Sequence, residues 1–162
     1  MKNFNLLTLS ILLVLSGTLA TTSGVSAQSS IPKPEEHFGF VPGSDYNLFT
    51  YEELTDYLMK LDKASPMVKM VENGQSPMGK KMYIVFISSE KNINNLEKLR
   101  EINRELALNP GLTESKQAEY IRDGKVFFLA TLSMHSTEVA PSQAAPQIAY
   151  NLVTSGDPLV KK

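Results

Sequence analysis

Apolar residues recur at helical spacing in two stretches of the chain, and a capping residue with a glycine stop marks a third helix. Thr50 and Glu53 form a Thr-x-x-Glu capping box, which predicts a helix over residues 51–63 with a stripe of leucines on one face. A charged helix is predicted over residues 92–108 and a shorter one over residues 113–122, and a glycine-containing stop follows each of them. The first two helices therefore each present one apolar face to a core.

Between and after these helices the pattern changes to that of strands. Residues 67–72 and 82–88 are separated by Asn, Gly and Pro, and this arrangement predicts an antiparallel hairpin. Residues 83–87 and Val126–Leu132 are apolar without polar alternation, so both segments are expected to be strands covered on both faces. Strands that alternate with helices predict an α/β domain with a mixed sheet covered by helices on both faces.

The first 27 residues have the pattern of a signal peptide. One lysine precedes the apolar run LLTLSILLVLSGTLA, and Val25-Ser26-Ala27 offers small residues for cleavage. A retained anchor is the alternative, but the run is shorter than the ~20 apolar residues that a spanning helix needs. We therefore expect export to the periplasm or the medium, with no stable membrane anchor after cleavage. Residues 28–45, rich in Pro, Gly and Ser, are expected to be an extended lead-in on a domain that covers residues 46–162.

Composition narrows the range of partners. The chain has 16 Lys plus Arg against 17 Asp plus Glu, and the predicted signal peptide takes away one lysine, so the exported protein is weakly acidic. This balance gives no reason to expect nucleic acid or an anionic membrane surface as a partner. The chain has no cysteine, so its stability has to come from a packed core.

A candidate metal site follows the third predicted strand. His135 and Glu138 form a His-x-x-Glu pair, and a tight turn at a helix start can bring an imidazole nitrogen and a carboxylate to one zinc ion. The alternative is a surface histidine beside a glutamate placed favourably at a helix N-terminus. Ser142 is expected to cap that helix, with Pro146 in its first turn. The other histidine, His37, is expected to be an exposed loop residue, since nothing beside it has metal-ligand spacing.

The order of these elements resembles the zinc carboxypeptidases of the carboxypeptidase A type. A helix leads to the hairpin VKMVENGQSPMGKKMYIVFIS, and a strand then delivers a His-x-x-Glu pair into a helix start in VFFLATLSMHSTEVAPSQ. The resemblance covers roughly Tyr46 to the last residue. It implies an exported zinc enzyme that removes C-terminal residues from peptides or proteins, with His135 and Glu138 as its first two zinc ligands. Thr137 stands where digestive members carry a substrate-binding arginine and some bacterial members a threonine, so the substrate preference is open.

The resemblance also implies residues that cannot be placed in this sequence. The family adds a further zinc histidine, an Asn and an Arg for the terminal carboxylate, and a glutamate as general base. No catalytic residue is therefore identified, and we interpret the chain as the N-terminal part of such an enzyme, with an incomplete fold. Two alternatives stay open: a non-catalytic relative that binds peptide or peptidoglycan stems on the same fold, and a structural envelope protein with a chance His-x-x-Glu.

Overall fold

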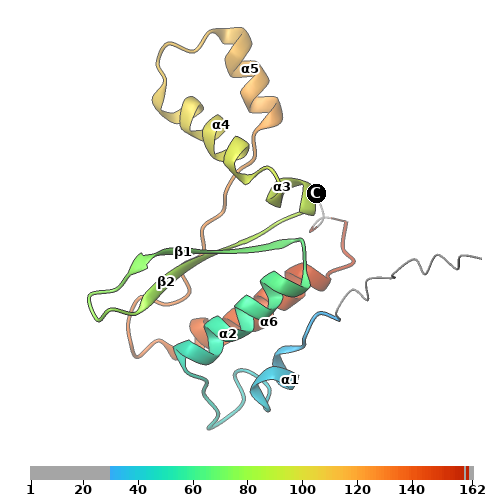
Figure 1. Cartoon of the computed structure of the whole chain (residues 1–162), viewed down its shortest axis with the longest axis vertical. Helices are drawn as coiled ribbons and strands as arrows, with labels where there is room; N and C mark the ends of the chain where they lie inside the picture. The colour runs from blue at the N-terminus through green and yellow to red at the C-terminus, as the bar shows by residue number, and fades with distance from the viewer. Residues whose placement is uncertain (1–29, 159, 161–162) are drawn as a thin grey trace, which may run out of the picture.

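The computed structural model describes residues 30–158 and residue 160. The predicted signal peptide lies outside these residues. The described elements, in chain order, are α1 (Pro34–Phe38), α2 (Tyr51–Ala64), β1 (Val68–Gln75), β2 (Lys81–Ile87), α3 (Glu90–Ile93), α4 (Leu96–Leu108), α5 (Glu114–Asp123) and α6 (Val139–Thr154) (Figure 1). The prediction of a chain that mixes helices and strands is thus confirmed. Among the described residues, no helix has the length and apolar character needed to cross a membrane.

The predicted hairpin is present and forms the centre of the molecule. β1 and β2 pair antiparallel with Val68 opposite Ile87 and Val71 opposite Ile84. Gly79 in the connecting turn and Gly74 near the end of β1, where the register shifts, both have positive φ, a backbone conformation that glycine adopts without steric cost. Helices α2 and α6 lie side by side along one side of this hairpin, while α4 and α5 project from the other side (Figure 1).

The hydrophobic core lies between the hairpin and the helices α2 and α6. Tyr57 and Leu61 of α2 are fully buried, and Val68, Ala149 and Val153 complete the buried cluster. The predicted capping box starts α2: the Glu53 N–H donates to the Thr50 hydroxyl, and the Glu53 carboxylate accepts the Thr50 N–H. The hairpin therefore contributes to the core at the end where Val68 and Ile87 pair.

The opposite face of the hairpin is only partly covered. Val85 and Ile87 pack against the core, whereas Phe86 lines an open cavity between the hairpin and α4. The side chains of residues 83–87 are half-buried, so the prediction that this strand is covered on both faces is wrong.

The third predicted strand is absent from the described structure. Val126–Leu132 forms an irregular connection between α5 and α6 (Figure 1), and no backbone hydrogen bond joins it to another described residue. A strand requires hydrogen bonds to a neighbour, and the hairpin does not pair with this segment. The prediction of a mixed sheet covered by helices on both faces is wrong for the described residues, whose sheet consists of two antiparallel strands.

Two helices differ from the sequence expectation in their limits. The predicted helix over residues 92–108 is divided into α3 and α4, with Asn94 and Asn95 between them. Helix α6 begins at Val139, so Ser142 lies in its first turn instead of capping it, and Pro146 lies in its interior. An interior proline removes one helical hydrogen bond, but the ring of Pro146 is fully buried, which offsets part of that cost.

The lead-in contains the short helix α1, which the expectation of an extended segment missed. Pro34 is fully buried, and the Tyr57 hydroxyl donates to the carbonyl of Pro32 at 3.1 Å. The lead-in therefore lies against α2, as expected. His37 is not an exposed loop residue, because it belongs to α1 and its side chain is only 9% exposed.

Candidate metal site

The structure brings His135 and Glu138 together in the turn that precedes α6. His135 Nδ1 lies 2.8 Å from Glu138 Oε1, and the side chains are 68% and 50% exposed. The backbone closes the same turn, since the Glu138 N–H donates to the His135 carbonyl at 3.0 Å. The two potential donors therefore converge on one accessible point at the N-terminus of α6.

Ser133 holds this turn in shape and was not anticipated from the sequence. Its hydroxyl lies 3.0 Å from the His135 carbonyl oxygen and 2.8 Å from the Glu138 carbonyl oxygen, so its proton is shared between them. Its φ of 89° lies in the left-handed region, which a non-glycine residue adopts only at some cost. The hydroxyl therefore stabilises a strained backbone beside the donor pair.

The charge of Glu138 suits a cation. The His135 imidazole, followed by the backbone N–H groups of His135 and Met134, donates hydrogen bonds that hold the pKa of the Glu138 carboxyl below its usual range. The carboxylate is therefore ionised at neutral pH. Zinc bound to Nδ1 would require the tautomer of His135 that carries its proton on Nε2, and the ion would replace the hydrogen bond between Nδ1 and Oε1.

The separation of the two donors is close to what one zinc ion needs. Zinc lies about 2.0–2.2 Å from nitrogen and oxygen donors, so tetrahedral geometry separates two such donors by about 3.3 Å. The observed 2.8 Å is shorter, and a small side-chain rotation would open the pair enough to admit the ion. Residues His135 and Glu138 thus fit two corners of a zinc site. No group of three or more His, Cys, Asp and Glu side chains that could hold a metal occurs among the described residues.

His37 has a structural role instead. Its Nδ1 lies 3.1 Å from the Lys60 ammonium, which is the donor, and its Nε2 lies 3.3 Å from the carbonyl oxygen of Glu53. Its ring also packs against the rings of Phe38 and Tyr57. Both nitrogens are engaged and a lysine ammonium is adjacent, so this histidine is poorly placed to bind a metal.

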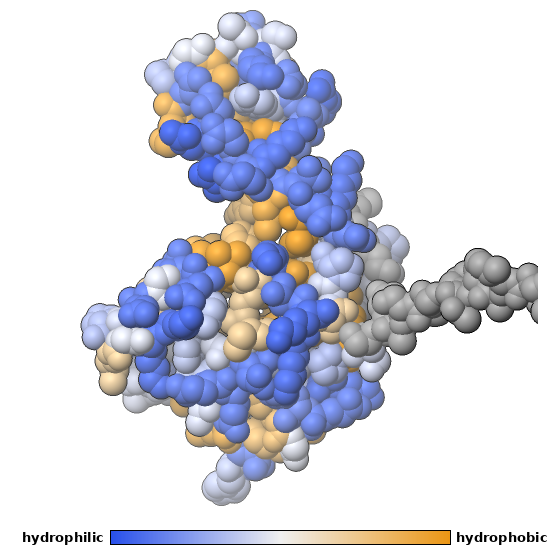
Figure 2. All heavy atoms as spheres, in the orientation of Figure 1, coloured by the Kyte–Doolittle hydropathy of each residue, from blue (hydrophilic) through white to orange (hydrophobic). Residues whose placement is uncertain are grey.

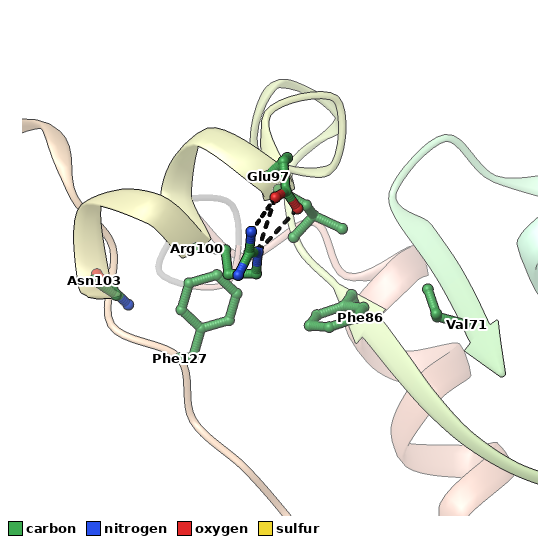
Figure 3. Close-up of a pocket in the computed structure, with 7 residues that line it drawn as sticks. Val71, Phe86, Glu97, Arg100, Asn103 and Phe127 are labelled. Carbon is green, nitrogen blue, oxygen red and sulfur yellow. Dashed lines mark hydrogen bonds and ion pairs between the residues drawn. The ribbon is translucent and has the colours of Figure 1, made fainter. Parts of the chain in front are cut away.

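A cavity of about 420 Å³ lies away from the donor pair, between the hairpin and α4. Figure 3 shows Phe86 and Phe127 projecting toward it from the two sides, with an Arg100–Glu97 ion pair at its rim. Neither His135 nor Glu138 lines this cavity, so it does not form a substrate pocket around the candidate metal site.

No protein-family model, no curated protein and no solved structure matches this chain. The resemblance to the zinc carboxypeptidases therefore stays a prediction from the sequence. A functional assignment has to be argued from the turn that carries His135 and Glu138.

Proposed function

We propose that this chain is the N-terminal part of an exported zinc metallocarboxypeptidase that hydrolyses C-terminal residues of peptides or proteins. The observation that carries the proposal is the convergence of His135 Nδ1 and Glu138 Oε1, 2.8 Å apart, at an exposed helix start. Both atoms are ordinary zinc donors, and the His-x-x-Glu order after an apolar segment is the one that the family resemblance implies. A bound zinc ion would polarise the last peptide carbonyl and activate a water molecule.

Each residue of the turn has a distinct part in this proposal. His135 supplies a neutral nitrogen donor, and Glu138 supplies a donor oxygen and one negative charge. Ser133 fixes the two carbonyl groups of the turn, so the donor side chains project from a defined backbone. Thr137, between the ligands, is too short to bind a substrate carboxylate as an arginine would, which leaves the preference for the substrate side chain open.

The remaining parts of the proposed enzyme are not among the described residues. A catalytic zinc site has three protein ligands and a water, and peptide hydrolysis also needs a general base. We therefore expect this chain alone to leave peptide C-termini intact, and a longer product that contains it to be active.

The second candidate is a non-catalytic relative that binds peptide or peptidoglycan stems. The observation that favours it is that the described residues offer two metal donors and not three. The two functions differ in one requirement, since the enzyme needs a third ligand and a base from residues that follow this chain. The gene sequence downstream of Lys162 is thus the most economical observation that separates them.

The proposed activity is tested by a C-terminal peptidase assay on such a longer product, with zinc present and after chelation. We expect zinc-dependent release of C-terminal residues, and we expect His135→Ala and Glu138→Gln each to abolish it. Glu114→Gln is a matched control, because Glu114 also lies at a helix N-terminus, in the first turn of α5. Wild-type turnover in both site variants would refute the ligand assignment, and the absence of any hydrolysis would favour the binding relative.

A further inference from the structure

Asn73 and Gly74 occupy a bulge in the hairpin. The register of the two strands shifts between Glu72 and Gln75, so two residues of β1 face one residue of β2 there. Asn73 and Gly74 are therefore outside the regular strand pairing. Both residues are exposed, and most of the surface at this end of the hairpin is hydrophilic (Figure 2). Water therefore reaches the peptide bond between them.

An asparagine that precedes glycine can react with its own backbone. The reaction joins the backbone nitrogen of the following residue to the side-chain carbonyl carbon, and glycine has no Cβ to obstruct this approach. Asn73 is the only asparagine of the sequence that precedes a glycine. Apart from adjacent residues, no atom lies within 4 Å of the place that a Cβ of Gly74 would take. Among the described residues, none makes a hydrogen bond to the Asn73 side chain, so this side chain is free to turn toward the backbone.

We propose that Asn73 is a modification site that converts spontaneously, in the folded chain, to aspartate and isoaspartate. The Gly74 nitrogen loses its proton and attacks Cγ of Asn73, and the side-chain amide group takes up a proton and leaves as ammonia. The product is a cyclic succinimide, which one water molecule then opens. Water that attacks Cγ restores the ordinary main chain and gives aspartate. Water that attacks the backbone carbonyl carbon leaves the chain connected through Cγ and gives isoaspartate.

The bulge is what allows this reaction to proceed in the folded chain. Ring closure requires Asn73 to rotate until Cγ reaches the Gly74 nitrogen, and the hydrogen bonds of a regular ladder oppose such a rotation. The bulge interrupts the ladder at these two residues, and the φ of 98° at Gly74 is one that glycine adopts without strain. We therefore expect the folded chain to react almost as fast as a free peptide of the same sequence.

The same bulge accommodates the products. Isoaspartate lengthens the main chain by one atom, and the strands pair on both sides of the bulge, so the added atom falls where the ladder does not fix the length of the chain. The part of the hairpin that enters the core is its other end, where Val68 pairs with Ile87. Modified chains should therefore stay folded and accumulate. The reaction requires neither zinc nor the proposed enzymatic activity.

Peptide mapping by mass spectrometry follows the reaction in the purified full chain during incubation in mildly alkaline buffer, which favours loss of the proton from the Gly74 nitrogen. We expect the fragment with Asn73 to gain the mass that exchange of an amide for a carboxyl group brings, and to contain both products. A blocked peptide of residues 71–75 gives the rate without a fold. The rate in the chain should lie within about tenfold of the peptide's rate, because opening an unpaired segment costs little free energy.

Two comparisons isolate the chemistry. Asn47 is the internal control, because it is also exposed but precedes leucine, and it should stay unmodified over the same time. Gly74→Ala should slow the reaction in both the chain and the peptide, and the peptide keeps this test valid if alanine at positive φ disturbs the hairpin.

Three results would overturn the proposal. The first is an intact Asn73 in the folded chain after the peptide has reacted, which would show that the bulge protects the site. The second is aspartate without isoaspartate, because direct hydrolysis of the side chain forms no ring. The third is equal modification of Asn47 and Asn73, which would show that the glycine and the bulge have no part in the reaction.

Discussion

Ser133 shows how a single residue prepares the proposed zinc site. Its hydroxyl contacts the carbonyl oxygens of both proposed ligand residues, and its backbone adopts φ 89° to do so. The side-chain donors of His135 and Glu138 are exposed, so their orientation depends on this turn instead of on packing. The geometry of the pair is therefore a property of the backbone before α6.

Two substitutions of Ser133 distinguish the contribution of its hydroxyl from the cost of its left-handed backbone conformation. Ser133→Ala removes the hydrogen bonds and leaves a side chain at positive φ, so we expect it to lower the free energy of unfolding by about 1 kcal/mol. Ser133→Gly removes the same bonds but relieves the steric cost of positive φ, so its loss should be smaller. Urea unfolding of the two variants beside wild type measures the difference. Equal stability of Ser133→Ala and wild type would show that the hydroxyl does not support the turn.

At the scale of elements, the capping box of α2 gives a pH dependence with a defined sign. The N–H and the hydroxyl of Thr50 donate hydrogen bonds to the Glu53 carboxylate and hold the pKa of Glu53 below its usual range. A carboxyl whose pKa is lower in the folded state adds stability above its unfolded pKa and loses it as the pH falls through the folded value. We expect Glu53→Gln to reduce the free energy of unfolding at pH 7. At a pH below both the folded and the unfolded pKa of Glu53, the variant should match wild type. Denaturant unfolding at several pH values tests this, and a pH-independent difference would contradict it.

Local signals in the sequence predicted the elements that depend on local interactions. The Thr50–Glu53 box and the turn glycines predicted α2 and the hairpin, because caps and turns form between residues close in the chain. The strand predicted at Val126–Leu132 depends on a partner strand. Its apolar pattern indicates that a strand there needs a neighbour, but the pattern does not identify that neighbour.

The sequence predicted that α6 begins after Ser142, because serine is a good capping residue. The helix begins one turn earlier, at Val139, directly after the turn that Ser133 stabilises. The His135–Glu138 pair was predicted from its spacing together with the family resemblance, because the spacing also fits a surface histidine beside a glutamate at a helix start. The contribution of Ser133 was not predicted, since a serine two residues before the motif carries no recognisable signal.

At the scale of the whole molecule, the hairpin separates two parts with different degrees of packing. Helices α2 and α6 pack against one face of the hairpin, while the other face borders a cavity and the exposed Val126–Leu132 segment. The candidate zinc site lies where this open segment enters α6, the helix that packs in the core. The site is thus fixed to the core on one side and accessible on the other.

The predicted signal peptide gives an expectation for the chain as a whole. A fusion of residues 1–40 to a reporter that works only outside the cytoplasm should be active, and the mature N-terminus should be Gln28, because small residues precede it at Val25 and Ala27. N-terminal sequencing of the secreted fusion checks the cleavage position. An uncleaved product held in the membrane would contradict the expectation and favour the retained anchor.

The most direct test of the central claim is isothermal titration of this chain with zinc. Two protein donors leave the ion short of its usual ligands, so we expect one weak site per chain. Its binding free energy should be well below the value of about 10 kcal/mol that marks the weakest complete structural zinc sites. His135→Ala and Glu138→Gln should each remove the binding heat, and Glu114→Gln should keep it. Zinc binding that is unchanged in both site variants would show that His135 and Glu138 are not ligands.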